Sequence, residues 1–221
     1  MKKERRSMWL LLLSLLVLLI ATLLIAMQLD SKSYLQRGSH GSEAGGRLPL
    51  EEALNIAVKY LLNEELAQAD KLLTETLIHY PESAECWMLS GSVCYRQRRY
   101  EKAEQAFRQT VKLQGNNAAA FNNLAESLVK LDRLDEAVKA LSKAVELAPG
   151  NGEIWLNGAK LFARLQQDER ALNFLQQALK NGAAAEQIAR QEELVKLLER
   201  AQQRSSQVQA EVETIKPEAK K

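Results

Sequence analysis

A repeat of 34 positions runs through the middle of this chain and limits its possible folds more than any other feature. It is clearest from Ala84 to Asn117, where nearly every informative residue recurs when the sequence is shifted by 34. Three registers show it: Ala69, Ala103, Ala137 and Ala171; Leu73, Phe107, Leu141 and Leu175; and Ala57, Gly91, Ala125 and Ala159. Such a chain is built from similar units that stack, because each unit has an apolar face that only its neighbour can bury.

The order of bulky, small and alanine positions within each unit resembles the tetratricopeptide-repeat family. The bulky position holds Ala53, Trp87, Phe121 and Trp155. The resemblance covers Leu50 to Ala185 and implies an all-α fold, an α-solenoid of four helical hairpins. The expected hairpins occupy residues 50–83, 84–117, 118–151 and 152–185, each with a helix A followed by a helix B.

The two ends of the array depart from the family pattern. The first unit has the small Ala53 at the bulky position, and the last has Gly158, Gln167 and Asp168 where apolar or helix-favouring residues are more typical. Residues 186–204 continue with helical spacing of apolar side chains, which predicts a C-terminal capping helix over the last hairpin. Residues 205–221 lose this periodicity, and we expect a disordered tail there.

An uncharged apolar run from Met8 to Leu29 precedes the repeats. About 20 such residues cross the hydrocarbon core of a bilayer as a helix, and the run is longer than the apolar part of a cleaved signal peptide, the competing interpretation. Residues 1–7 are basic, so the positive-inside rule predicts a cytoplasmic N-terminus, a single-pass transmembrane helix over 8–29 and repeats on the non-cytoplasmic side. In a bacterial inner membrane that side is the periplasm. Residues 30–49, rich in Gly and Ser, are predicted to be a flexible linker.

Composition argues against nucleic acid and against catalysis. The net charge is +2, but the first six residues contribute +3, which leaves −1 for the remainder. The two histidines, His40 and His79, have no motif-spaced partners, and we interpret Cys86 and Cys94 as small buried residues. We therefore predict no catalytic residue, no metal site, no cofactor and no small-molecule substrate.

Binding of a protein or peptide partner is the function that the resemblance implies. In this family the concave groove is lined by positions 2, 5, 6, 9, 12 and 13 of each unit. The matching candidates here are Asn55, Tyr95, Arg96, Asn122, Asn123, Glu126, Lys130, Asn157, Lys160 and Arg164. Asparagine can donate to and accept from a peptide backbone simultaneously, and the basic residues suit an acidic or carboxyl-terminal peptide. Leu54 and Val58 replace the residues that the family's chaperone clamp needs, and the alternative that these candidates are ordinary surface polar residues stays open.

The sequence as a whole predicts a membrane-anchored scaffold that binds partner proteins through this groove, in assembly or maintenance of envelope complexes. One alternative is a maturation or chaperone-like factor, for example of the cytochrome c biogenesis type, which presents a client chain to a membrane enzyme. Another is an accessory subunit that acts only within an enzyme complex.

Overall fold

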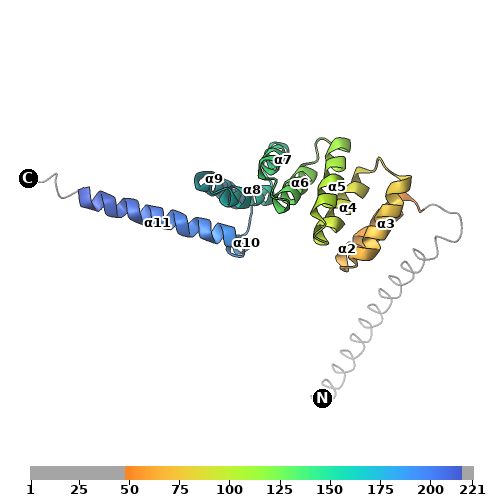
Figure 1. The fold of residues 1–221 in the computed structure, drawn as a ribbon, viewed down its shortest axis with the longest axis horizontal. Coiled ribbons are helices and arrows are strands. Elements are labelled where there is room, and N and C mark those ends of the chain that lie inside the picture. The colour runs from red at the N-terminus through yellow and green to blue at the C-terminus, as the bar shows by residue number, and fades with distance from the viewer. Residues whose placement is uncertain (1–47, 216–221) are drawn as a thin grey trace, which may run out of the picture.

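A computed structural model describes residues 48–215, and within them the chain folds into ten α-helices with no strand. Figure 1 shows the helices following one another along a row, with a long C-terminal helix projecting from the end. The predicted all-α solenoid is confirmed over this part of the chain. The predicted transmembrane segment Met8–Leu29 lies outside the described residues, and no helix between residues 48 and 215 is long and apolar enough to cross a bilayer.

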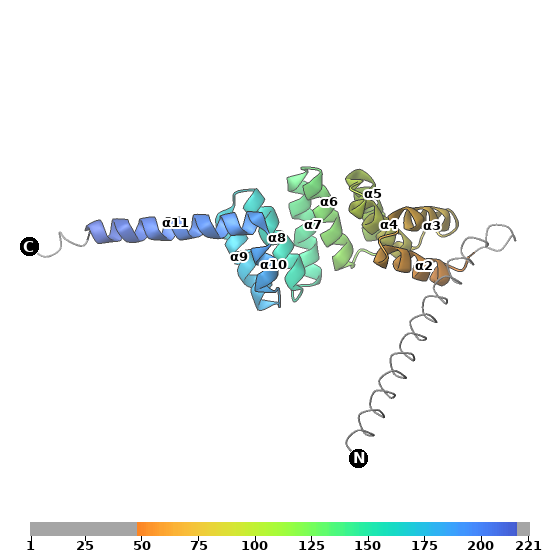
Figure 2. The same ribbon diagram turned by 90° about the horizontal axis from the view of Figure 1, so that it is seen from below.

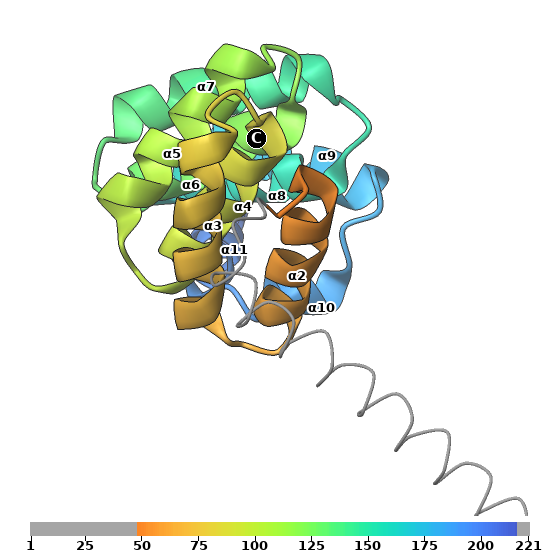
Figure 3. The same cartoon turned by 90° about the vertical axis from the view of Figure 1, so that its right-hand side faces the viewer.

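Eight of the helices form four antiparallel hairpins, in which each helix packs on its successor. The A helices are α2 (Leu50–Leu62), α4 (Ala84–Arg96), α6 (Ala118–Lys130) and α8 (Gly152–Arg164), and the B helices are α3 (Leu66–His79), α5 (Tyr100–Leu113), α7 (Leu134–Leu147) and α9 (Asp168–Lys180). Every A helix begins 34 residues after the previous one, as does every B helix. Figures 2 and 3 show the same stack from below and from its N-terminal end.

Repeated local signals set the ends of these helices. Ser83, Asn117 and Asn151 each precede an A helix and accept a hydrogen bond from a backbone N–H of its first turn, for example Ala120 N to Asn117 Oδ1 at 2.9 Å. Such caps satisfy donors that the helix leaves unpaired. The turn from helix A to helix B contains one residue with φ between 57° and 62°, at Glu64, Arg98, Asp132 and Gln166. The 34-residue period therefore extends to backbone conformation.

The small residue in the middle of each A helix allows its B helix to come close. Ala57, Ala125 and Ala159 are almost fully buried at this position. At Gly91 a Cβ atom would lie 2.6 Å from the ring of Phe107, so this position of the second unit must remain glycine unless the ring moves. The sequence interpretation of these residues as packing positions is therefore correct.

The fourth unit has a small residue on α8 opposite a large aromatic residue on α9. Gly158, which the sequence marks as unusual, faces Phe174, and a Cβ atom added at Gly158 would lie 2.3 Å from that ring. The Phe174 ring packs edge-on against Trp155, with centroids 4.9 Å apart, and against Phe162. Gly158 thus makes room for an aromatic cluster in the last hairpin.

The C-terminal cap differs from the prediction of one helix over 186–204 followed by a disordered tail from 205. It consists of a short α10 (Ala185–Ala189) and a long α11 (Glu192–Ile215), which begins where Leu194 N and Val195 N donate to Gln191 O. Leu194 and Leu197 are fully buried and α11 contacts α8 and α9, so its first part does cover the last hairpin. The helix continues through residues 205–215, where glutamine, alanine and glutamate favour the helical conformation.

Asp168 connects the last hairpin to this cap. Its carboxylate is buried and accepts from the Arg200 guanidinium at 2.6 and 3.1 Å, while Arg204 lies 3.2 Å away. These arginines hold the pKa of Asp168 below its usual value, chiefly through the hydrogen bonds from Arg200. The unusual acid at the start of α9 is therefore an attachment point for α11.

Candidate functional site

One face of the A helices forms the candidate site, which we call the A-helix groove. It contains positions 9 and 13 of each unit, residues 58, 92, 126 and 160 and residues 62, 96, 130 and 164. Neighbouring A helices contact one another along the stack, so these positions form continuous rows. Their spacing of four places both rows on the same side of each helix.

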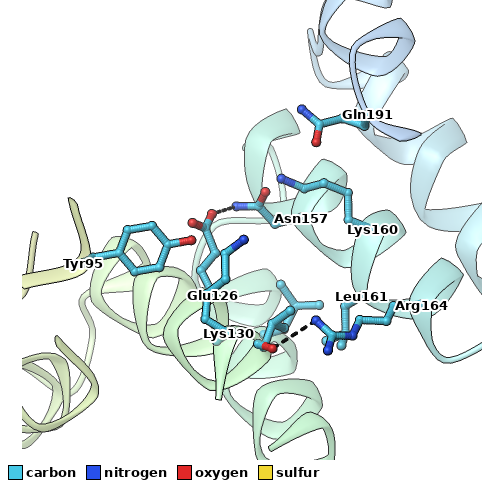
Figure 4. A pocket seen from close by; sticks show the side chains of 11 residues that line it. Tyr95, Glu126, Lys130, Asn157, Lys160, Leu161, Arg164 and Gln191 are labelled. Carbon is cyan, nitrogen blue, oxygen red and sulfur yellow. Dashed lines mark hydrogen bonds between the residues drawn. The ribbon is translucent and has the colours of Figure 1, made fainter. Parts of the chain in front are cut away.

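One cavity of the A-helix groove lies where α4, α6 and α8 meet the start of α11, and its volume is about 140 Å³. We call it the main cavity because it gathers most of the predicted groove residues. Figure 4 shows its polar side chains converging from these elements. Six of the ten predicted groove residues line it: Tyr95, Glu126, Lys130, Asn157, Lys160 and Arg164. A second cavity, of about 170 Å³, lies beside it and is lined by Arg96 and Asn123, again with Tyr95 and Glu126. The structure thus brings predicted residues of three units together.

Two predicted groove residues lie apart from these cavity walls. Asn55 is exposed on α2 and lines neither cavity. Asn122 is 5% exposed and bonded to a neighbouring unit, so it supports the groove from beneath. Repeat position alone could not show that Asn122 is buried whereas Asn123 lines a cavity, because this difference depends on how α8 packs on α6.

Asn157 has a different role from the one that the sequence suggests. Its Nδ2 amide donates to Asn122 Oδ1 at 3.1 Å and to Glu126 Oε1. An amide group has two N–H donors, so both are committed and only the Oδ1 acceptor is left for a ligand. The prediction that Asn157 grips a peptide backbone through both its donors and its acceptor is wrong, because the amide joins α6 to α8.

Glu126 is the partly buried acid in the wall of the main cavity. Burial raises the pKa of its carboxyl group, while the Lys160 ammonium and hydrogen bonds from Tyr95 and Asn122 act in the opposite direction. Burial also raises the pKa of the Tyr95 phenol, and the nearby Glu126 charge adds to this effect. A carboxylate held by neutral donors can orient a ligand, and among residues 48–215 no group of three or more His, Cys, Asp or Glu side chains could hold a metal ion.

Arg96 and Arg164 hold the preceding hairpin in place. Arg164 donates to Val129 O at 3.1 Å and to Asp132 Oδ1 at 2.8 Å, and the bond to Val129 is drawn in Figure 4. Arg96, 68 residues earlier, donates to Leu61 O at 2.8 Å and pairs with Glu64. Both arginines line the cavities of the groove, but each is paired with an acid in the preceding turn, so part of its positive charge is balanced within the chain.

Lys130 occupies the equivalent position between the second and third units, but the turn residue there is Arg98. No acid is available for Lys130 in that turn, and in the described part of the chain neither Lys130 nor Arg98 makes an ion pair. Figure 4 shows the Lys130 amino group turned into the cavity toward Glu126, with Lys160 reaching in from α8. These two lysines are the cations that the groove offers to a ligand.

Several residues of the cavity were missed by the sequence interpretation. Gln191 enters from the segment before α11, and Leu161 and Val129 form part of the apolar wall. Comparing position 13 with the turn residue that faces it in the previous unit would have separated Lys130 from the two arginines. Gln191 carries no such signal, because its position depends on the cap.

Neither cysteine thiol is activated as a nucleophile. Burial raises the pKa of the Cys86 thiol to about 11. Burial also raises the pKa of Cys94, although Arg99 Nη2, 3.3 Å from its sulfur, favours the thiolate. Both thiols are buried and free, which agrees with their interpretation as packing residues.

Comparison with known families agrees with this geometry. Two family models, both described as tetratricopeptide repeat, match the chain, one at residues 54–120 and the other at residues 95–146 and 128–194. These units are tetratricopeptide repeats. The hairpins of this repeat array serve protein interaction in general, and the groove of its A helices is the natural place to look for a partner.

Solved structures support the same repeat fold. A crystal structure of MamA superposes with a TM-score of 0.59 at 17% identity, covering 68% of this chain and 85% of that one. A structure titled as the functional characterization of Pseudomonas aeruginosa pilF gives a TM-score of 0.61 at 20% identity, covering 69% of each chain. At such identities the likeness concerns the fold alone.

Two curated proteins match part of the repeat array. The yeast Saccharomyces cerevisiae protein "Essential for maintenance of the cell wall protein 1" is 31% identical over 134 residues, 58% of this chain and 15% of that protein. The human protein O-mannosyl-transferase TMTC3 is 29% identical over 84 residues, 38% of this chain and 9% of its own length. The chain thus spans only a small part of either relative.

Proposed function

We propose that this tetratricopeptide-repeat chain is a membrane-anchored scaffold that holds a partner protein or peptide in its A-helix groove. The observation that supports it most is the main cavity, where three units and the cap place Tyr95, Glu126, Lys130 and Lys160 around one space. The lysines have no ion-pair partner among the described residues. A face used only for packing within the chain would not gather two lysine ammonium groups around a single carboxylate in a hollow.

The anchoring part of the proposal depends on the uncharged run Met8–Leu29 and the basic residues before it. With the N-terminus in the cytoplasm, the repeats lie on the other side of the membrane, in the periplasm if the membrane is a bacterial inner membrane. There the scaffold serves assembly or maintenance of envelope complexes. The yeast relative named for cell wall maintenance is in keeping with such a role.

A client-presenting factor is the second candidate, and the first unit favours it. Val58 and Leu62 are exposed apolar residues in the same rows that carry charge in later units. Exposed apolar side chains in a binding face suit a segment that is not yet folded. A stable stoichiometric partner on purification would favour the scaffold, whereas transient capture of newly made chains would favour this alternative.

Capture of the native partner tests groove binding. The triple variant Asn123→Ala, Lys130→Ala and Lys160→Ala removes groove side chains that make little contact with the rest of the fold. The matched control is Gln109→Ala, Lys112→Ala and Lys139→Ala, three exposed positions on α5 and α7. We expect the first variant, and not the second, to lose the partner that the full-length chain retains in detergent extracts. Equal capture by both variants, with unchanged helicity, would exclude the A-helix groove as the binding site.

Topology has its own test. A reporter that is active only outside the cytoplasm, fused after Lys221, should be active in the full chain. An inactive reporter, together with an active cytoplasmic reporter at the same place, would contradict the proposed orientation.

A further inference from the structure

The chemical character of the A-helix groove changes along its length. In the first unit, positions 9 and 13 hold Val58 and Leu62, and the same positions hold Ser92 and Arg96 in the second. In the third and fourth units they hold Glu126 with Lys130 and Lys160 with Arg164. The fold repeats every 34 residues, so these differences reflect the sequence and not the geometry. The groove therefore has an apolar end and a cationic end.

The apolar end lies on α2. Val58 is 40% exposed and Leu62 is 77% exposed, and the half-buried Leu54 and Leu61 lie on the same helix. Position 13 in later units carries a basic side chain, which in two of them bonds to the turn of the preceding unit. The first hairpin has no preceding repeat to which such a side chain could bond. An exposed polar residue would serve there, yet the helix carries two apolar side chains four positions apart, which share one face. Apolar area on a binding face is most useful when a ligand removes it from water.

The cationic end lies on α6 and α8. Arg164 is neutralised by Asp132 at 2.8 Å, but Lys130 faces Arg98 in place of an acid. The main cavity therefore contains two lysine ammonium groups, Lys130 and Lys160, and one carboxylate, Glu126. Two ammonium groups therefore stand beside this one carboxylate in the cavity wall, and Glu153, at the start of α8, is a further acid within electrostatic reach of it. A ligand carboxylate would add negative charge at a cavity wall in which ammonium groups outnumber carboxylates.

We propose that the occupant of the A-helix groove is one segment with two chemically distinct ends, lying in a fixed direction. An apolar side chain covers Val58 and Leu62, and an acidic side chain lies between Lys130 and Lys160. This inference rests on the proposed function, because it specifies the ligand of the same groove. Packed helices lie about 8 to 10 Å apart, so the groove from α2 to α8 is roughly 25 Å long, which about eight extended residues cover.

Selection of peptides on the full chain tests the proposal without knowledge of the natural partner. A random library of displayed dodecamers is selected on residues 1–221 kept in detergent, and the enriched sequences are read. We expect Asp or Glu near one end and Leu, Ile, Val or Phe toward the other, in one consistent order. One enriched peptide is then synthesised with a fluorophore, and its affinity for each variant is measured by anisotropy.

Two pairs of variants separate the two ends. Lys130→Gln with Lys160→Gln should weaken the peptide about tenfold, as expected when a desolvated charge contact is lost, and should remove its preference for an acidic residue. The control pair Lys112→Gln with Lys139→Gln removes the same number of positive charges at exposed positions outside the groove. Leu62→Gln should weaken the peptide and remove its apolar preference, whereas Ile78→Gln, at a residue 73% exposed on α3, should leave affinity within about twofold.

Each outcome decides between the proposals. Enriched peptides that are displaced by the groove variants but show no acidic or apolar preference would overturn the two-ended ligand and leave groove binding intact. A library in which no peptide depends on groove residues would count against both. A concentration-dependent dimer of the wild-type chain that Leu62→Gln abolishes would show that a second copy covers the apolar end, and this too would overturn the proposal.

Discussion

The junction between α6 and α8 and the junction between α4 and α6 occupy equivalent places in the repeat, yet they are built differently. In the first, Arg164 pairs with Asp132, and Asn157 bonds Asn122 and Glu126. In the second, Lys130 faces Arg98, and Asn123 Nδ2 lies 3.9 Å from the Met88 sulfur. The first junction pairs the basic residue of position 13 and the asparagine of position 6 within the chain, whereas the second leaves Lys130 without an ion pair and Asn123 with one weak contact among the described residues. The difference teaches that position in the repeat does not decide whether a polar residue is structural, and that its partner in the preceding unit does.

The largest effect should come from substituting the two equivalent asparagines. Asn157→Ala leaves the Oδ1 atom of the buried Asn122 without its donor and removes one of the donors to the Glu126 carboxylate, which should reduce the free energy of unfolding by about 1 to 3 kcal/mol. Asn123→Ala removes one weak contact to sulfur and should cost less than about 1 kcal/mol. Urea unfolding of both variants measures the difference, and equal losses would mean that the two junctions are not distinct.

Glu126 offers a pH-dependent view of the same junction. Its pKa is raised in the folded chain, so the native state binds this proton more tightly than the unfolded state does. The wild type should therefore gain stability relative to Glu126→Gln as the pH falls through the raised pKa toward the unfolded value of about 4.3. Urea unfolding at pH 7, 5.5 and 4 checks the sign. A difference in unfolding free energy that shifts in favour of Glu126→Gln on acidification would contradict the predicted sign.

A smaller effect is expected for the two basic residues at position 13. Arg164→Gln loses an exposed ion pair and a bond to a carbonyl, at a cost of about 0.5 to 1 kcal/mol. Lys130→Gln should be neutral in stability, because Lys130 has no acid to lose, and should affect ligand binding alone. Thermal melts of the two variants side by side reveal the contrast. Loss of stability in Lys130→Gln as large as in Arg164→Gln would indicate an ion pair that the structure does not contain.

The smallest effect should follow from adding an acid to the junction between α4 and α6. Arg98→Glu places an acid in the turn opposite Lys130, as Glu64 and Asp132 are placed opposite their arginines. The new pair should stabilise the chain by about 0.2 to 1 kcal/mol and draw Lys130 away from the cavity. Peptide affinity should then fall while stability rises. A variant that is more stable and binds equally well would show that Lys130 does not contact the ligand.

Much of the fold could be predicted from the sequence because each repeat position makes the same contacts in every unit. Gly91 beside Phe107 and the alanines at the same position of the other units are examples, since a steric requirement repeated four times is visible as a period. The roles of Asn157 and Arg164 were not predictable in this way. Their partners, Glu126 and Asp132, lie in the previous unit, about one repeat earlier in sequence, and only the packing of α8 on α6 brings them together.

The cap was predicted in part, for a related reason. Apolar spacing predicted a capping helix, in which Leu194 and Leu197 are buried but Val195 and Leu198 are exposed, and the end of α11 depends on helix propensity beyond the packed region. Asp168 stood out as an acid at an apolar position, and its meaning became clear only with Arg200 opposite it. Departures from the repeat pattern at Gly158 and Asp168 therefore mark special contacts of the last hairpin.

Site-specific photo-crosslinking tests the central claim, that the A-helix groove is the binding face, most directly. A photoreactive amino acid is placed at Ser92, in the wall of the second cavity, or at Gln109, exposed on α5, in the full chain in intact cells. The account predicts a discrete crosslinked partner from position 92 and none from position 109, with the crosslink lost when Lys130→Gln and Lys160→Gln are introduced. The same partner crosslinked from position 109 and not from position 92 would contradict it.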